Sequence, residues 1–268
     1  MTLSLKRISA MFLRYLYLHK RSLPRTLEVI FWPVMELLVW GFLVMYLRSF
    51  ELSTVSTAVV FLINAMIFWD ILYRSQQGVT ISFVEEIWTQ NVINLLVSPL
   101  KIWEWIASTF LYGMLKTIVI TCVLAILAYF LYAFDLVGSI GLLVIPLVFQ
   151  LLLFGWAVGM ITSGLMIRFG HSAEALIWGV PYLIMPLSAI YYPLDVLPVP
   201  LQVISRCIPT TYVFEGMRAI HRTGTMEMNY FVWAMALNLI YFVVASFFFA
   251  TMYHHAQKTG RLGKLGLD

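Results

Sequence analysis

The few ionisable side chains that interrupt the long apolar runs of this sequence are its first candidates for chemistry. Glu36 lies near the middle of the first run. If that run crosses a membrane, a charge there is costly and marks a candidate functional residue. Glu36 could be paired across a subunit interface or simply protonated. Asp70 precedes Arg74 by four residues, the spacing of an ion pair on one helix face. Glu36, Asp70 and the neutral Asn64 are our intramembrane polar candidates.

Other small or polar residues in the runs predict contacts between helices. Polar side chains in apolar surroundings bond across helices, and we expect this of Asn64, Gln150 and Asn238. Gly155, Gly159 and Ser163 recur every four residues, a spacing that lets two helices approach closely. This contact is expected within one chain, with a dimer contact as the alternative.

The sequence does not contain the residue patterns that several kinds of enzyme require. No G-x-x-x-x-G-K-[ST] phosphate loop occurs, and GRLGK at 260–264 has the wrong spacing. We therefore expect no ATP binding by this chain. Adjacent His254 and His255 point to different sides of a helix, so no metal site is predicted. Ser163 has no histidine at a matching depth to act as its base, which argues against an intramembrane protease.

The composition requires lipid as the main solvent. Of the 268 residues, 62% are hydrophobic and only 11% are charged, against roughly 25% charged in soluble domains. One crossing needs about 20 apolar residues. The sequence therefore predicts an all-α polytopic membrane protein, a single permease domain over 1–268, with six transmembrane helices. The predicted spans are 27–47, 54–73, 106–134, 139–167, 173–192 and 230–253.

The distribution of cations predicts the topology. Residues 1–26 carry six cations among aromatics and leucines, so we expect a basic amphipathic helix on the membrane surface rather than a cleavable signal peptide. With the N-terminus inside, thirteen Lys and Arg fall on cytoplasmic segments and four outside. The positive-inside rule then places both termini in the cytoplasm. The expected location of the chain is a bacterial inner membrane. No basic patch with interleaved aromatics indicates nucleic acid.

One long connection lies inside the cell in this topology. Residues 83–105 read FVEEIWTQNVINLLVSPLKIWEW. The region 83–100 has apolar residues at helical spacing and a polar face that includes Glu85, Glu86 and Asn94. Ser98 and Pro99 should end this helix. We expect a short helix across the cytoplasmic mouth that receives a push from a soluble partner, with an ordinary interfacial loop as the alternative.

The other long connection, 191–229, lies outside. Its prolines Pro193, Pro198 and Pro209 divide it into short helices, with a proline at a favourable first position. Both pieces are apolar but too short to cross a bilayer. A re-entrant helical hairpin between spans five and six fits this pattern, and a lid on the surface is the alternative.

Taken together, these features resemble the membrane subunit of type-2 ABC transporters, the exporter permease family that includes drug, nodulation-factor and polysaccharide exporters. The resemblance rests on the order of the spans, on LLVSPLKIWEW and on YYPLDVLPVPLQVI…IPTTYVFEGMR, and it covers nearly the whole chain. Arg218 after Pro209 also matches the family pattern, and Glu215 lies between them. Polysaccharide exporters often carry Asn before that proline, so Ile208 favours a drug-like or lipid-like substrate.

The resemblance implies the site residues, partners and cofactors. The cytoplasmic segment would be the coupling helix that docks on an ATPase subunit, through Glu85, Glu86, Asn94, Leu95, Ser98 and Pro99. Charge reversal at Glu85 and Glu86 should then uncouple ATPase stimulation without unfolding the permease. The implied assembly is a permease homodimer, or one copy with a close paralogue, in membrane lipid with two ATPase subunits, which bind the ATP and Mg. This chain itself binds no cofactor.

The function expected from these observations is an ATP-driven exporter subunit that forms the path for an amphipathic, lipid-like, drug-like or glycan substrate. Two alternatives belong to other classes. One is a membrane scaffold without a transported solute, and the other is a secondary transporter that moves protons through Glu36. Secondary carriers often contain inverted repeats, and none is detected in this sequence.

Overall fold

A computed structural model describes residues 3–48, 53–135, 138 and 141–260. These residues form helices and connecting turns, with no β-strand among them. The helices are α1 (Leu5–Lys20), α2 (Leu23–Arg48), α3 (Ser53–Trp88), α4 (Val92–Val97), α5 (Ile102–Tyr132), α7 (Val144–Phe169), α8 (Glu174–Ile184), α9 (Val199–Arg206), α10 (Pro209–Thr223) and α11 (Met228–Lys258). The all-α prediction is confirmed for the described part of the chain.

Four described helices are long and apolar enough to cross a membrane. They are Leu23–Leu47, Ile102–Tyr132, Gly141–Phe169 and Met228–Lys258, and each contains most of one predicted span. The second predicted span falls in α3, whose 36 residues continue well beyond residue 73. The chain is thus a multi-pass helical membrane protein, and the count of six spans stays a prediction.

The predicted fifth span, 173–192, is not one continuous helix. Helix α8 has 11 residues and is followed by the four-residue 3-10 turn Met185–Ser188. At about 1.5 Å per residue in the α-helix and about 2.0 Å in the 3-10 turn, these cover only about 25 Å, less than the roughly 30 Å hydrocarbon core. Pro186 has no N–H for a helical bond, and Ala189 takes a left-handed φ of 50°. Both features stop the helix.

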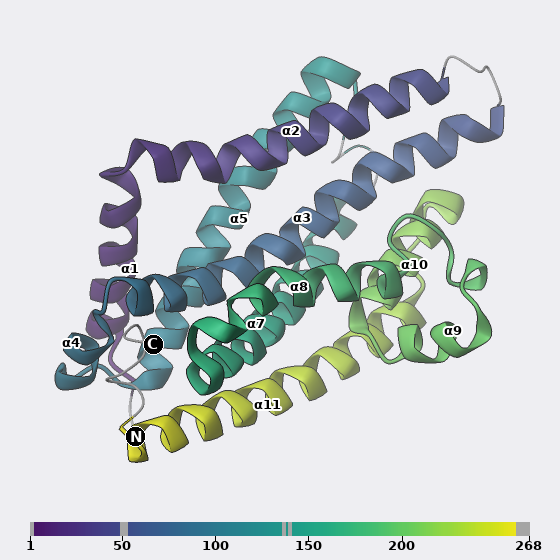
Figure 1. Ribbon diagram of the computed structural model, residues 1–268. Helices are drawn as coiled ribbons and strands as arrows, with labels where there is room; N and C mark the ends of the chain where they lie inside the picture. Colours follow the sequence, from purple (N-terminus) through teal and green to yellow (C-terminus); the bar gives the residue numbers. More distant parts are fainter. Residues whose placement is uncertain (1–2, 49–52, 136–137, 139–140, 261–268) are drawn as a thin grey trace.

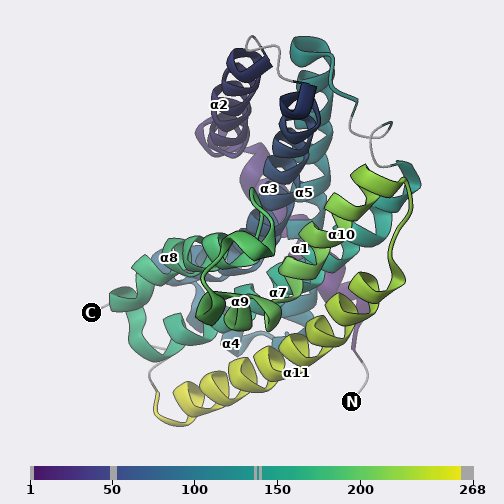
Figure 2. The same cartoon turned by 90° about the vertical axis from the view of Figure 1, so that its right-hand side faces the viewer.

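The molecule has two distinct ends (Figure 1). Helices α1 and α4 and the last turn of α11 lie at one end, which we call the basal end, and α1 runs across the long helices there. Helices α9 and α10 lie at the other end, the apical end, which faces the viewer in Figure 2. The predicted 1–26 helix ends earlier, because α1 stops at Lys20 and α2 begins at Leu23.

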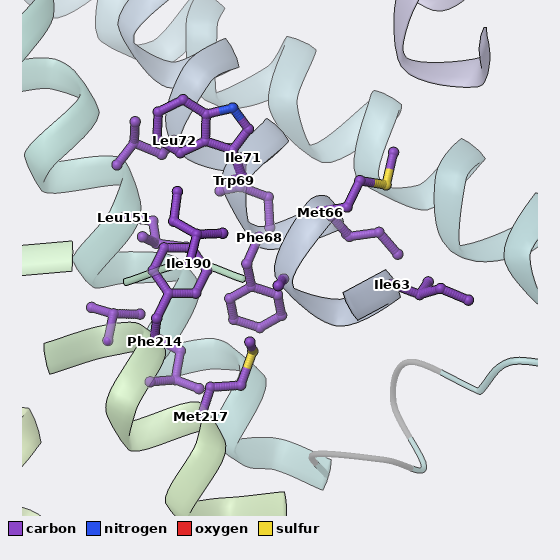
Figure 3. Packing of buried hydrophobic residues seen from close by; sticks show 14 of the residues in the cluster. Ile63, Met66, Phe68, Trp69, Ile71, Leu72, Leu151, Ile190, Phe214 and Met217 are labelled. Carbon is purple, nitrogen blue, oxygen red and sulfur yellow. The ribbon is translucent and has the colours of Figure 1, made fainter. Parts of the chain in front are cut away.

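Helix α3 forms the centre of the packing. It lies along α7, α5 and α2, while α11 lies along the other side of α7. Side chains of α3 such as Phe68 and Leu72 are fully buried. Figure 3 shows them beside Leu151 of α7, Phe214 of α10 and Ile190 after α8. In lipid, close van der Waals packing of such side chains holds helices together, so this cluster joins α3, α7 and α10 with the chain after α8.

Small residues set the distance between α3 and α7. A Cβ on Gly155 would lie 2.6 Å from the Cβ of Ser75, and a Cβ on Gly159 would lie 2.7 Å from the Cβ of Val79. Real Cβ atoms do not approach so closely. The predicted contact within one chain is therefore confirmed. It also allows the hydroxyl of Ser75 to donate to the carbonyl of Leu152 at 3.0 Å.

Amide side chains bond between helices, as predicted. The Nδ2 of Asn238 on α11 donates to the Oε1 of Gln150 on α7 at 2.6 Å. The Nε2 of Gln150 donates to the carbonyl of Phe231 at 3.2 Å. Both amide residues are 1% exposed. In apolar surroundings such bonds select one register between the two helices, because any slip would leave both amides without partners.

Candidate functional site

Helix α4 presents an apolar surface at the basal end. Val97 is 83% exposed and Ile93 is 49% exposed, with the exposed Asn94 between them. We call Ile93, Asn94 and Val97 the α4 surface. The opposite side of the helix is held in place, because Val92 is buried and Leu95 packs half-buried against the basal core. A short amphipathic helix with apolar side chains on its outer face is suited to binding a partner.

A rigid corner follows α4, as the sequence predicts. The Ser98 hydroxyl donates to the carbonyl of Leu95 at 2.6 Å and accepts from the Leu100 N–H at 3.3 Å. Pro99 then prevents the helix from continuing, and its carbonyl accepts a hydrogen bond from the Arg7 guanidinium at 2.8 Å. The corner is therefore tied to α1, and α4 is coupled to the N-terminal helix.

Three ion pairs, which we call the α1 clasp, fasten the N-terminal segment to the ends of α3 and α5. The Arg14 guanidinium holds both carboxylate oxygens of Glu86. The Arg7 guanidinium lies 2.8 Å from the carboxylate of Glu104. Arg25 approaches Glu85 at 3.7 Å. The same Glu104 carboxylate accepts from the backbone N–H of Ser4 at 2.8 Å, so the clasp anchors the start of α1.

The clasp corrects the sequence-based interpretation of Glu85 and Glu86. Both residues lie on α3, which continues to Trp88, rather than on a separate short helix. Glu86 is 1% exposed, so it faces Arg14 and not a docking partner. Docking through Asn94, Leu95, Ser98 and Pro99 stays a prediction. The exposed Ile93 and Val97 were missed, because the apolar spacing of the segment pointed only to its buried face.

His19 joins the clasp region to α5. Its Nδ1 lies 2.5 Å from the Tyr112 hydroxyl, and the Tyr15 hydroxyl nearby accepts from the indole N–H of Trp105 at 2.7 Å. Burial, together with the positive charges of Lys116 and Arg25, lowers the pKa of His19 to about 4. At neutral pH the ring is therefore uncharged in the folded protein.

The depressed pKa of His19 predicts that acidic pH destabilises the packing of α1 against α5. Between pH 6.5 and pH 4 an unfolded histidine binds a proton that the folded one does not. The free energy of unfolding is therefore unaffected by the titration of His19 above pH 6.5, and it decreases as the pH falls from 6.5 toward 4. The unfolding temperature in detergent should fall from pH 7.5 to pH 5, and His19→Gln should reduce that fall. His255→Gln, at an exposed position on α11, should keep the wild-type pH dependence, and equal slopes for both variants would count against His19.

The intramembrane polar candidates divide between two places. Asp70 on α3 pairs with Arg74 at 3.1 Å, which confirms the predicted i,i+4 pair. Glu36 on α2 is half-buried and close enough for its charge to act on Asp70 and Arg74. Within the described residues Glu36 makes no ion pair or hydrogen bond. Asn64 lies elsewhere, since its Nδ2 is 2.9 Å from the Nε2 of His221 on α10.

The apical candidates Glu215 and Arg218 do come together. The Arg218 guanidinium donates to Glu215 at 2.8 Å and to the carbonyls of Ile190 and Tyr192 at 2.9 Å and 2.6 Å. It also lies 4.6 Å above the ring of Phe61 on α3. Glu215 accepts from the N–H of Leu194 at 2.8 Å. This pair satisfies carbonyls of the chain that follows the 3-10 turn Met185–Ser188, and it orients the chain that leads to α9.

The predicted prolines lie at the boundaries of the apical helices. Pro193 precedes a 3-10 turn, Pro198 is the N-cap residue of α9, and Pro209 is the first residue of α10. These are positions where the missing N–H is not needed. The two predicted short helices are thus present, and their insertion into a leaflet stays a prediction.

The comparison with known protein families gives one match. The model of the ABC-2 type transporter family matches residues 15–221. These residues include the last six residues of α1, all of α2 to α9, and α10 as far as His221. No curated protein matches the chain.

Proposed function

The chain belongs to the ABC-2 type transporter family, and from that premise we propose that it is the membrane subunit of an ATP-driven exporter for an amphipathic substrate. The family domain is the membrane component of an ABC transporter, which works with an ABC ATPase subunit and is not itself an ATPase. In the proposed assembly two ATPase polypeptides bind ATP and Mg, and a second permease copy completes the path.

The observation that carries this proposal is the α4 surface. Val97 and Ile93 extend from a helix whose other side is fixed in the basal core. An apolar surface supported in this way can bind an ATPase and transmit its movement to α3 and α5, which α4 connects. The proposed orientation puts the basal end in the cytoplasm, in agreement with the distribution of cations.

Mechanical transmission follows from the connections of α4. The Ser98–Pro99 corner passes a displacement of α4 directly to the start of α5, and the turn at Gln90, with a φ of 53°, passes it to the end of α3. Because α3 is packed on several sides, its displacement would move α7 and α2 as well. We propose that this movement opens the path alternately to the two sides of the membrane.

Serine at Val97 tests the docking role directly. Burial of a valine at an interface contributes about 1.5–3 kcal/mol, so Val97→Ser should weaken ATPase binding about tenfold. Val97→Ser combined with Ile93→Ser should weaken it by a further factor of about ten. The measurements are the amount of ATPase subunit that co-purifies with the permease in detergent and the rate of ATP hydrolysis by the complex.

The matched control is Val199→Ser. Val199 is 72% exposed, but it lies on α9 at the apical end, so the ATPase should bind as in the wild type. All of these variants should unfold at the wild-type temperature, because the replaced side chains are exposed. Normal ATPase binding by the doubly substituted α4 surface would exclude the proposed docking role.

A further inference from the structure

A cavity of about 690 Å³ opens at the apical end. Its walls come from α10, from Phe61 and Leu62 of α3, from the chain between Tyr191 and Asp195, and from the end of α9 and the start of α11. Its volume lies within the range of small-molecule sites in proteins. It is far from α4, so the proposed docking of an ATPase does not account for it.

The charged groups of the cavity differ in what they can bind. The Arg218 guanidinium is already committed to Glu215 and to backbone carbonyls. The ring of His221 faces Asn64, and burial lowers the pKa of His221, so it adds no positive charge at neutral pH. Arg206 and Arg222 also line the cavity, and neither side chain makes an ion pair or hydrogen bond with the rest of the described chain.

The two open arginines have different electrostatic surroundings. Carboxylates lie near Arg222, because the charges of Arg222, Asp195 and Glu215 all act on the hydroxyl of Tyr230. Arg206 is the last residue of α9, and its backbone is fixed because the Tyr212 hydroxyl donates to its carbonyl at 3.0 Å. Arg206 therefore offers the cavity a guanidinium that no carboxylate of the described residues pairs with.

Aromatic rings form another part of the cavity wall. Tyr191, Tyr212 and Phe61 contribute to the walls. Two of these rings are held in place, since Tyr191 stacks on Trp40 at 4.7 Å and Tyr212 stacks on Trp233 at 6.4 Å between ring centroids. Rings fixed in this way offer apolar area with little loss of conformational entropy on binding.

We propose that this cavity binds an anionic amphiphile, whose phosphate or carboxylate pairs with Arg206 and whose apolar body lies against Tyr212, Tyr191 and Phe61. A guanidinium forms two parallel hydrogen bonds with such an anion. Arg222, Asp195 and Glu215 also line the cavity and supply donors and acceptors for a polar group on the same molecule.

The test measures binding to the purified permease in a neutral detergent, by native mass spectrometry. The probes are lysophosphatidic acid, lysophosphatidylcholine with the same acyl chain, and glycerol 3-phosphate. Wild-type protein should bind lysophosphatidic acid about tenfold more tightly than lysophosphatidylcholine, as expected for one charge-assisted hydrogen-bonded pair. Arg206→Gln should remove this preference, and Arg222→Gln should reduce it less. Arg168→Gln, at an exposed arginine in the last turn of α7, should leave it unchanged.

The outcomes separate the sources of the anion. If glycerol 3-phosphate binds as tightly as lysophosphatidic acid, the apolar body does not contribute to binding. The site would then be assigned to soluble anions instead of lipids, with Arg206 still as the anion contact. An unchanged preference in Arg206→Gln, or no preference in the wild type, would overturn the proposal. The measurement needs no ATPase, so its failure would leave the proposed export function standing, and a failure of ATPase docking would leave this site standing.

Discussion

Replacement of Glu86 by lysine will destabilise the folded protein by about 3 kcal/mol or more, the order of cost for leaving a charge without its partner in a buried site. Glu86 is 1% exposed, and its carboxylate is held by Arg14 and by the side-chain amide of Asn91 at 2.6 Å. A lysine would place a second cation against Arg14. The unfolding temperature in detergent should fall by roughly 6–12 °C.

Two variants show whether the ion pair is the cause. Arg14→Glu combined with Glu86→Lys restores opposite charges and should recover part of the loss. Glu85→Lys should cost less than about 1 kcal/mol, because Glu85 and Arg25 are 3.7 Å apart and the Arg25 side chain is 39% exposed. Equal losses at positions 85 and 86 would contradict the α1 clasp. This expectation differs from the sequence-based one, in which both charges are reversed without unfolding, because the structure places Glu86 in a buried ion pair with Arg14.

An alanine at position 78 will force α3 and α5 apart. A Cβ on Gly78 would lie 2.4 Å from the Cα of Gly113, and a Cβ on Gly113 would lie 3.0 Å from the Cα of Gly78. Both close atoms are backbone atoms, so no side chain can rotate out of the way. Overpacking of this kind costs about 1–3 kcal/mol and sometimes more, and we expect Gly78→Ala to reach the upper part of that range.

The control for this substitution is Gly179→Ala. A Cβ on Gly179 would meet nothing within 4 Å, and Gly179 lies within helix α8. Alanine has a higher helix propensity than glycine by about 1 kcal/mol, so Gly179→Ala should be neutral or stabilising. Thermal unfolding of the two variants in the same detergent makes the comparison. A Gly78→Ala protein as stable as Gly179→Ala would exclude the close contact between α3 and α5.

The cytoplasmic connection shows where sequence patterns stop being informative. The corner at Ser98 and Pro99 was predictable, because proline constrains the backbone of its neighbour wherever it occurs. The assignment of Glu86 to an outer polar face was not sound. Its partner Arg14 is 72 residues away in the sequence, and periodicity within one segment contains no information about so distant a contact.

The apical segment also combines local features that the sequence predicted with distant contacts that it did not. Its prolines correctly predicted two short helices, since each proline restricts only the residues beside it. The cavity was not predictable, because its walls come from α3, α10 and the chain after α8. Arg218 and Arg206 are both arginines near short helices in the sequence, yet only the tertiary contacts show that the first is committed to carbonyls and the second is open.

The sequence alone determined that the chain is a helical membrane protein, that its helices are broken at particular prolines, and that Asp70 can pair with Arg74. These properties depend on composition and on residues within one helical turn of each other. Only the tertiary structure decided which charges are buried, where α3 approaches its neighbours at glycine, and which face of α4 remains open. Those properties depend on contacts between helices that are distant in the chain, and their geometry arises only when the helices pack.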